Sequence, residues 1–560
     1  MSTAKATWKQ LAEEKRRRRD SLIPKEWILK SPPPADQLDV TNIPEQSGIL
    51  TEREVEITNA NVDDLLSKLA VKTWSAVEVA TAFAKRAVIA HQLTNCLTEI
   101  FIEPALRRAA WLDEQLEKTG RTIGPLHGLP ISLKDQINVK GIESTMGYTS
   151  WIGKYAERNS VLADILELQG AVLYVKTNVP QTLMWGETYN FIFGRTSNPF
   201  NRALTCGGSS GGEGALIALK GSPLGVGSDI GGSIRIPSAF NGLYGFRPSY
   251  NRVPYSGCVN SLEGQEAILS VLGPMTTSIG GIKHFMKTVL AMQPWYRDPM
   301  MLKMPWNESA YRLTEHGNGK QLCFGILWND GIVHPHPPVI RALEMVKATL
   351  IAKGHRVIDW EPFKLFEIGL NAYRIYEADG GEDFEAETIS TGEPVIKTMS
   401  LDPVDVANIP PLEKPLTAYE LWQVHKRIRE LKREYLEYWQ ASTRKTGTGR
   451  PVDGIIAPVA PYAAPPHGMN KYTLYTVMWN ALDYPALVIP VTRTDLRVDI
   501  KRAPPALFGE SDKQIHDLYE PDRFANAPVS VQIVGQRQED EAVIGMAEIV
   551  GQALAEHREV

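Results

Sequence analysis

Residues 206–248 read CGGSSGGEGALIALKGSPLGVGSDIGGSIRIPSAFNGLYGFRP and contain two clusters of glycine and serine. The first cluster is Gly207–Gly212 and the second is Gly231–Ser233. Glycine allows positive φ and lets backbone N–H groups approach a ligand closely. A serine in such a loop can be a nucleophile, and the bare N–H groups beside it can form an oxyanion hole. The two clusters therefore predict an acyl-transfer site built around serine.

A lysine upstream completes the pattern. Lys134 lies in the run LPISLKD at 129–135, whose apolar first part reads as a buried strand. A free lysine is protonated at neutral pH, but burial disfavours the charged form and lowers its pKa. A lysine and two serines form a version of the serine hydrolase constellation that needs no histidine. The sequence therefore predicts that Lys134 is a buried base.

These motifs closely resemble the amidase signature family. The matching segments are GGSSGG at 207–212, GSDIGGSIRIPSAFNG at 227–242 and LPISLKD at 129–135. The segment GGSSGGEGAL is most similar to the fungal acetamidase and fatty acid amide hydrolase branch of the family. The resemblance covers roughly residues 60–550. It implies an α/β fold in which a large twisted mixed β-sheet is covered by α-helices on both sides.

The resemblance also implies a role for each site residue. Ser233 would be the nucleophile, Ser209 would follow a cis peptide bond and relay protons, and Lys134 would be the base. The expected oxyanion-hole donors are the N–H groups of Ile230, Gly231, Gly232 and Ser233. The expected supporting residues are Ser210, as a further hydrogen-bonding serine, and Asp229 with Arg235, as an ion pair that shapes the loop or else a surface pair.

The residues that line the substrate pocket are predicted from their apolar character and from their position relative to the glycine–serine motif. Leu183, Met184 and Trp185 match the segment that lines the acyl pocket in the fatty acid amide hydrolase branch. A second candidate wall is formed by Tyr475, Trp479 and Asn480, in the segment YTLYTVMWNALDYPA at 472–486. Bulky aromatic side chains there would narrow the pocket and favour short amides or carbamates over long lipid chains.

Other interpretations of the motifs fit less well. Residues 208–212 also match G-x-S-x-G of the α/β-hydrolases, but that motif needs a strand directly before it, and TSNPFNRALTCG at 196–207 is polar and turn-like. A phosphate loop is disfavoured because neither GxxxxGK[ST] nor a GxGxxG after a strand is present. No cofactor and no metal are expected, because the histidines and the four separated cysteines show no ligand spacing.

The predicted function is hydrolysis of a small aliphatic or aryl carboxamide, with esters or carbamates as further substrates. An ammonia-supplying subunit of an amidotransferase complex is the alternative. A non-catalytic binding protein is a third class, which the intact Lys134, Ser209 and Ser233 disfavour.

The composition limits the partners and the cellular location that we expect for the protein. The 560 residues carry a net charge of −5, which argues against nucleic acid as the main partner. No stretch is long and apolar enough to cross a membrane, and the first residues have no signal-peptide core. The separated cysteines suggest a reducing compartment, so a cytoplasmic location is expected.

The chain divides into a helical arm at 1–59 and a single amidase signature domain at 60–560, in which 360–450 is the variable, substrate-shaping region. The basic run 15–19 is interpreted as a solvated helix face balanced by neighbouring acidic residues, and a nuclear signal or a contact with anionic lipid is the alternative. The charged helix at 419–439 has an apolar stripe that would pack on the core or on a second copy of the chain, so a homodimer stays open; the stripe is Leu421, Val424, Ile428, Leu431 and Leu436.

Periodicity and end signals predict the following strands and helices. The strands are 129–133, 171–175, 323–327, 355–360, 486–491 and 529–535, and the helices are 75–91, 161–169, 338–353, 419–439 and 540–557. Their alternation indicates an α/β layered fold with a mostly parallel or mixed sheet.

Overall fold

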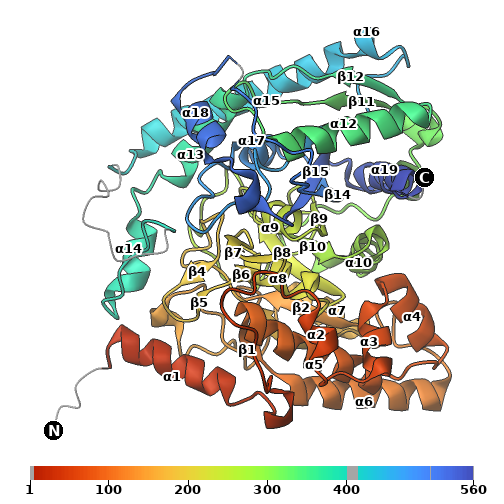
Figure 1. Cartoon of the computed structure of the whole chain (residues 1–560), viewed down its shortest axis with the longest axis vertical. Coiled ribbons are helices and arrows are strands. Elements are labelled where there is room, and N and C mark those ends of the chain that lie inside the picture. The colour runs from red at the N-terminus through yellow and green to blue at the C-terminus, as the bar shows by residue number, and fades with distance from the viewer. Residues whose placement is uncertain (1–5, 400–413, 505, 559–560) are drawn as a thin grey trace.

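A mixed sheet of 11 strands forms the centre of the molecule (Figure 1). The computed structural model describes residues 6–399, 414–504 and 506–558. The strand order is β1-β3-β2-β8-β10-β9-β14-β15-β13-β11-β12. Strand β2 pairs in parallel with β3 and β8, and β11 pairs in parallel with β12 and β13, whereas the other neighbours are antiparallel. The predicted mixed sheet is therefore confirmed.

The strands of this sheet are β1 (Leu97–Ile100), β2 (Pro130–Lys134), β3 (Val172–Thr177), β8 (Leu224–Asp229), β9 (Tyr244–Arg247), β10 (Val271–Thr276), β11 (Cys323–Ile326), β12 (Arg356–Asp359), β13 (Gly454–Pro458), β14 (Ala486–Arg493) and β15 (Pro528–Val534). Two short ribbons pair β4 (Tyr189–Asn190) with β5 (Gly194–Arg195), and β6 (Ser197–Asn198) with β7 (Asn201–Thr205).

Helices flank the sheet, with α4 to α6 near its β1 end and α12, α15 and α16 near its β12 end (Figure 1). The α-helices of the described residues are α1 (Trp8–Asp20), α2 (Ile43–Gln46), α3 (Glu52–Asn59), α4 (Val62–Ala70), α5 (Ala76–Thr94), α6 (Ile102–Thr119), α7 (Val161–Leu168), α8 (Gly211–Ala218), α9 (Arg235–Phe240), α10 (Ile279–Ala291), α11 (Glu308–Tyr311), α12 (Pro337–Ala352), α13 (Leu365–Tyr376), α14 (Glu382–Ile389), α15 (Ala418–Ala441), α16 (Thr443–Thr446), α17 (Leu474–Leu482), α18 (Glu510–Leu518) and α19 (Asp540–Arg558).

The predicted elements lie close to where their end signals placed them. Helix α5 begins after Ser75, whose hydroxyl accepts the N–H of Glu78 while the Glu78 carboxylate accepts the N–H of Ser75. This is the predicted capping box, which satisfies two N–H groups that a helix end leaves unpaired. The other predicted helices match α7, α12, α15 and α19, and the predicted strands match β2, β3, β11, β12, β14 and β15.

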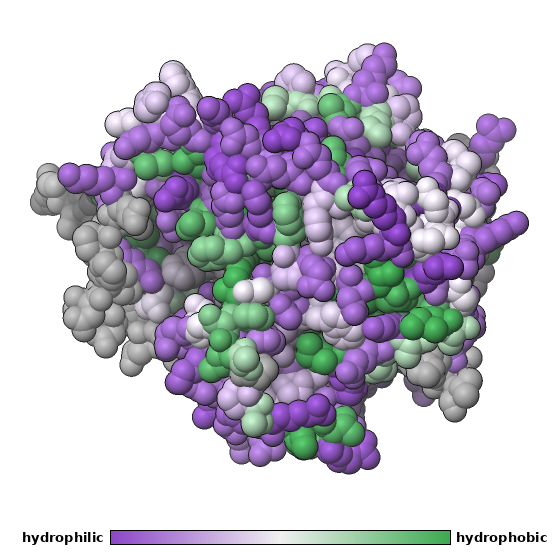
Figure 2. All heavy atoms as spheres, turned by 90° about the horizontal axis from the view of Figure 1, so that it is seen from above, coloured by the Kyte–Doolittle hydropathy of each residue, from purple (hydrophilic) through white to green (hydrophobic). Residues whose placement is uncertain are grey.

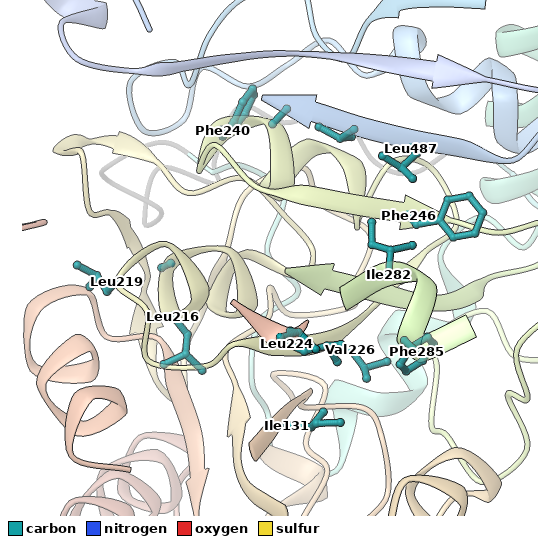
Figure 3. Close-up of a cluster of buried hydrophobic side chains, with 14 of the residues drawn as sticks. Ile131, Leu216, Leu219, Leu224, Val226, Phe240, Phe246, Ile282, Phe285 and Leu487 are labelled. Atoms are coloured by element: carbon teal, nitrogen blue, oxygen red, sulfur yellow. The ribbon is translucent and has the colours of Figure 1, made fainter. Parts of the chain in front are cut away.

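Buried apolar side chains hold the helices to the sheet. In Figure 3, Leu216 of α8, Leu219 directly after α8, and Leu224 and Val226 of β8 lie in one such cluster, together with Phe285 of α10. Burying a side chain of this size stabilises the fold by roughly 1.5–3 kcal/mol. This cluster fixes the position of β8, whose last residues lead directly into the second glycine cluster.

The outer surface is mostly polar. Figure 2 shows hydrophilic residues over most of the face seen from above, with hydrophobic residues in patches between them. Among the described residues, no helix combines the length and the apolar character needed to cross a membrane.

The N-terminal helix α1 is not the solvated face that its basic run suggested. Lys15 and Arg19 are buried, and Lys15 Nζ forms ion pairs with Glu99 and Glu143. Arg17 matches the prediction, because it is exposed and pairs with Glu14 on its own helix. Residues four apart lie on one helix face, so Lys15 and Arg19 together face the body of the protein. The sequence-based interpretation failed for Lys15 because its acidic partners, Glu99 and Glu143, come from distant segments. Arg19 does pair with the neighbouring Asp20, but it is buried and also donates to the carbonyl oxygen of Leu97.

Helix α15 packs on the core through a stripe that differs in part from the predicted one. Val424, Ile428 and Leu431 are buried as predicted, but the stripe continues through Tyr435 and Trp439. Leu436 is 45% exposed and Leu421 is half-buried. Spacings of three and four residues from Leu431 lead to Tyr435, so Leu436 falls on the outer face.

Candidate active site

Lys134 is the last residue of β2 and is fully buried. Its Nζ lies 2.6 Å from Ser209 Oγ and 2.7 Å from Ser228 Oγ. Burial disfavours the ammonium form and lowers the pKa of Lys134 to about 7, although nearby carboxyl groups such as Asp229 act in the opposite direction. A large fraction of this side chain is therefore neutral at pH 7 and has a lone pair that can accept a proton.

Ser209 lies in the loop between β7 and α8, and a cis peptide bond joins it to Gly208, as predicted. A Cβ atom at Gly208 would lie 2.6 Å from the carbonyl oxygen of Glu187, so only glycine fits there without a shift of the backbone. The neighbouring Ser210 Oγ lies 3.3 Å from both the N–H and the carbonyl oxygen of Ser228. The supporting role predicted for Ser210 stays a prediction, and this contact with β8 supports it.

Ser233 lies between β8 and α9, is 8% exposed and borders a cavity. Its carbonyl oxygen accepts the N–H of Ser210 at 3.1 Å, which joins the two glycine–serine loops. Among the described residues no hydrogen bond joins Ser209 Oγ to Ser233 Oγ. Catalytic hydrogen bonds of this kind often tighten only when substrate is bound.

Asp229 and Arg235 form a fully buried ion pair, with Arg235 Nη2 3.0 Å from Asp229 Oδ1. Burial opposes ionisation of Asp229, but the charge and hydrogen bonds of Arg235 outweigh it and hold the pKa of Asp229 well below its usual range. Arg235 also bonds to the carbonyl of Thr476 and to Gln532 at 3.1 and 3.2 Å. The pair is therefore not a surface pair, and it ties the Ser233 loop to α17 and β15.

The same carboxylate organises the turn that holds Ser233. Asp229 Oδ1 accepts the N–H of Gly232 at 2.8 Å, and Asp229 Oδ2 accepts the N–H of Ile234 at 3.1 Å. The N–H of Gly232 is thus already bonded to Asp229, which does not fit its predicted role as an oxyanion donor. The N–H groups of Ile230, Gly231 and Ser233 stay as predicted donors.

Side chains from two later helices hold the carbonyl groups of this turn. Tyr376 Oη of α13 donates to the carbonyl oxygen of Ile230 at 2.7 Å, and Thr476 Oγ1 of α17 donates to that of Gly231 at 2.7 Å. The Tyr376 hydroxyl uses its single proton in this bond, whereas the Thr476 hydroxyl also lies 2.9 Å from the carbonyl oxygen of Thr473. The turn is therefore held on its N–H side by Asp229 and on its carbonyl side by α13 and α17, which preorganises the amides around Ser233.

A cavity of about 70 Å³ opens beside Ser233. The predicted residues Leu183, Met184 and Trp185 all line it. Its other lining residues are Gly186, Gly208, Ile230, Gly231, Ile236, Tyr373, Tyr376, Thr473 and Val477. A larger adjoining cavity of about 700 Å³ shares Met184, Trp185, Gly186, Tyr373 and Thr473 with it. We call the first the inner pocket and the second the vestibule.

Trp479 does not line the inner pocket, so this part of the prediction is wrong. It is fully buried, and its ring lies 6.1 Å from Tyr435 and 6.3 Å from Tyr484, in a second apolar cluster. Thr473 and Val477 of the same segment line the pocket instead. These two lie four residues apart and share a helix face, whereas Trp479 points to another face.

The structure adds residues that the motifs did not reveal. Ser228 binds Lys134 directly, and Gln136 Oε1 accepts the Ser228 hydroxyl at 2.6 Å. Tyr373 and Tyr376 reach the inner pocket from α13. The signal for Ser228 and Gln136 was their position beside Asp229 and Lys134. For Tyr373 and Tyr376, the only indication in the sequence was that α13 lies in the region predicted to shape the substrate site.

Comparison with known proteins agrees with this geometry. The family model for Amidase matches residues 78–544. The chain is 45% identical to the acetamidase of Emericella nidulans over 551 residues, which cover 98% of each chain. A solved fatty acid amide hydrolase superposes with a TM-score of 0.89 at 33% identity and covers 97% of this chain and 94% of its own. The native peptide amidase from Stenotrophomonas maltophilia shares the fold, with a TM-score of 0.67 at 19% identity, over 89% of this chain and 97% of its own.

The chain therefore belongs to the amidase signature family. Within that class it is an amide hydrolase that cleaves C–N amide bonds, and the likeness to acetamidases extends over nearly its full length.

Proposed function

We propose that this protein hydrolyses small carboxamides, acetamide among them, through an acyl-enzyme on Ser233. The observation that carries the proposal is the buried Lys134, bonded to Ser209 at 2.6 Å beside a serine that opens into a cavity of about 70 Å³. The names of the acetamidases that share 45% of its residues support the same substrate.

In the first half-reaction, neutral Lys134 takes the proton of Ser209 while Ser209 takes the proton of Ser233. Ser233 Oγ then bonds to the amide carbon, and the carbonyl oxygen becomes an oxyanion. The N–H groups of Ile230, Gly231 and Ser233 would stabilise it, and each such donor typically contributes about 3 kcal/mol. The proton held at Lys134 returns through Ser209 to the leaving nitrogen, the C–N bond breaks, and ammonia leaves.

In the second half-reaction, water attacks the acyl-enzyme. The water gives its proton to Ser209, Ser209 passes one to Lys134, and a second tetrahedral intermediate forms. Its collapse returns the proton to Ser233 Oγ and releases the carboxylic acid. The same route would serve esters and carbamates that fit the pocket, because the acyl-enzyme chemistry is shared.

The volume of the inner pocket supports a short acyl group. Pockets for drug-sized ligands measure roughly 300–1,000 Å³, and this pocket is far smaller at about 70 Å³. Leu183, Val477 and Ile236 supply apolar walls for an acyl methyl or ethyl group. The vestibule would admit the amide and release its products, and its walls include Phe366 and Leu370 of the predicted substrate-shaping region.

The test compares kcat/KM for acetamide, propionamide, butyramide and hexanamide by release of ammonia. We expect the value to fall steeply beyond propionamide. Ser233→Ala and Lys134→Ala should each lower kcat by at least about 10³-fold. Ser67→Ala, the same change at an exposed serine of α4, is the control and should keep full activity. A preference for hexanamide would refute the proposed substrate class.

The partners, the location and the oligomeric state that the sequence predicts are proposals as well. The comparisons give no support to the ammonia-supplying subunit, and turnover of acetamide by the isolated chain would exclude the need for a partner. A cytoplasmic location is supported by four free cysteines, none of which forms a disulfide. The homodimer is tested by light scattering after size-exclusion chromatography.

A further inference from the structure

The side chain of Gln136 is fully buried beside Lys134, and all of its polar positions have defined partners. Its Nε2 donates to Tyr255 Oη at 2.7 Å and to the carbonyl oxygen of Val259 at 2.9 Å. A carbonyl oxygen can only accept, so the amide nitrogen must face Val259. The opposite orientation of the amide is excluded, and Oε1 therefore faces Ser228.

This orientation fixes the direction of the next hydrogen bond. Gln136 Oε1 lies 2.6 Å from Ser228 Oγ and can only accept. The single proton of the Ser228 hydroxyl is therefore directed at Gln136. Ser228 Oγ keeps only lone pairs for its other contact, which is Lys134 Nζ at 2.7 Å.

Lys134 must then donate to Ser228. A neutral lysine amine has two N–H groups and one lone pair. Because Ser228 offers no proton, one N–H of Lys134 is directed at Ser228, and the lone pair is left for the other contact, Ser209 Oγ at 2.6 Å. A Ser228 hydroxyl that was free to turn would instead donate to the lone pair and occupy the base.

We propose that Gln136 is a positioning residue that sets the polarity of the Lys134–Ser228 hydrogen bond and so reserves the lysine lone pair for Ser209. This inference rests on the proposed function, since it assumes that Lys134 activates Ser233 through Ser209. Gln136 touches neither the inner pocket nor the vestibule, so it acts on the nucleophile and not on substrate binding.

The test measures how fast a fluorophosphonate labels Ser233, located by peptide mass spectrometry, together with kcat and KM for acetamide. Gln136→Leu removes the acceptor and frees the Ser228 hydroxyl. We expect labelling and kcat to fall about ten- to a hundred-fold, with KM within about two-fold of the wild type.

The matched control is Gln92→Leu on α5. Gln92 also accepts one N–H, from Leu29, and donates to two carbonyl oxygens, of Trp27 and Val88, but it lies away from the site. It should lose thermal stability without losing labelling rate. A thermal melt of each variant shows that the protein compared is folded.

A double-mutant cycle with Ser228→Ala identifies the route of the effect. If Gln136 acts through the Ser228 hydroxyl, Gln136→Leu should lower the labelling rate less than about two-fold in the Ser228→Ala background. Additive losses, or a folded Gln136→Leu that labels at the wild-type rate, would overturn the inference alone. Failure of the wild type to label at Ser233 would overturn the proposed function as well, and so the two failures are distinguishable.

Discussion

Replacing Lys134 by methionine should stabilise the folded protein while it abolishes activity. Burial lowers the pKa of Lys134, the proposed base, from the usual 10.5 to about 7. A tenfold change in an ionisation constant corresponds to about 1.4 kcal/mol. At a pH where Lys134 is charged in the folded protein, its burial therefore lowers the free energy of unfolding by about 5 kcal/mol. Methionine has a similar volume and no charge to bury.

The hydrogen bonds of Lys134 reduce this gain. The methionine variant loses the two bonds to Ser209 and Ser228, each of which contributes about 1 kcal/mol. The net stabilisation expected at acid to neutral pH is therefore about 3 kcal/mol. The folded pKa of about 7 lies below the unfolded value of 10.5, so the unfolded state binds more protons between these two pH values. Wild-type stability therefore rises with pH in that window, and the advantage of the variant is full below pH 7 and is lost towards pH 10.5.

The assay is thermal unfolding of both proteins from pH 6 to pH 10, with acetamide hydrolysis measured in the same buffers. Wild-type kcat/KM should rise about tenfold per pH unit up to about pH 7 and then level off, because only neutral Lys134 is active. Lys176→Met is the matched control, since Lys176 is a buried lysine of the adjacent strand β3 that binds the Glu143 carbonyl and Ser144 outside the site. It should keep most of the activity. Two results would refute the inference that Lys134 is a desolvated base. One is a Lys134→Met protein that is less stable than the wild type at pH 6, and the other is a wild-type kcat/KM that rises only near pH 10.

Three further changes test other parts of the structure. Arg235→Leu leaves Asp229 buried without its cation and should cost about 3–5 kcal/mol in urea unfolding, and a loss below about 1 kcal/mol would contradict the role of the pair. Val477→Ala enlarges the inner pocket and should raise the ratio of kcat/KM for butyramide over acetamide about tenfold, whereas an unchanged ratio would place the acyl group elsewhere. Lys15→Met removes a buried cation between Glu99 and Glu143 and should lower the free energy of unfolding by about 3 kcal/mol. The control Arg17→Met, on the exposed face of α1, should change it by less than about 0.5 kcal/mol. Equal effects of the two substitutions would contradict the packing of α1 on the body of the protein.

Much of the framework could be predicted from sequence because its signals are local. Ser75 with Glu78 marked the start of α5 through the capping box, and short apolar runs marked β2 and β3. The prediction was weaker where a helix face had to be chosen. In α17 the apolar character runs all round the helix, so nothing local showed that Val477 faces the pocket and Trp479 the core.

By itself the sequence determined the family and the proposed catalytic residues, because the two glycine–serine clusters and the lysine after an apolar run are local motifs that can be recognised without their partners. Only the tertiary structure decided how they are held. Ser228 reaches Lys134 across 94 residues of chain, and Tyr376 reaches the Ile230 carbonyl across 146. Hydrogen-bond direction and burial depend on such distant neighbours, and no local pattern encodes them.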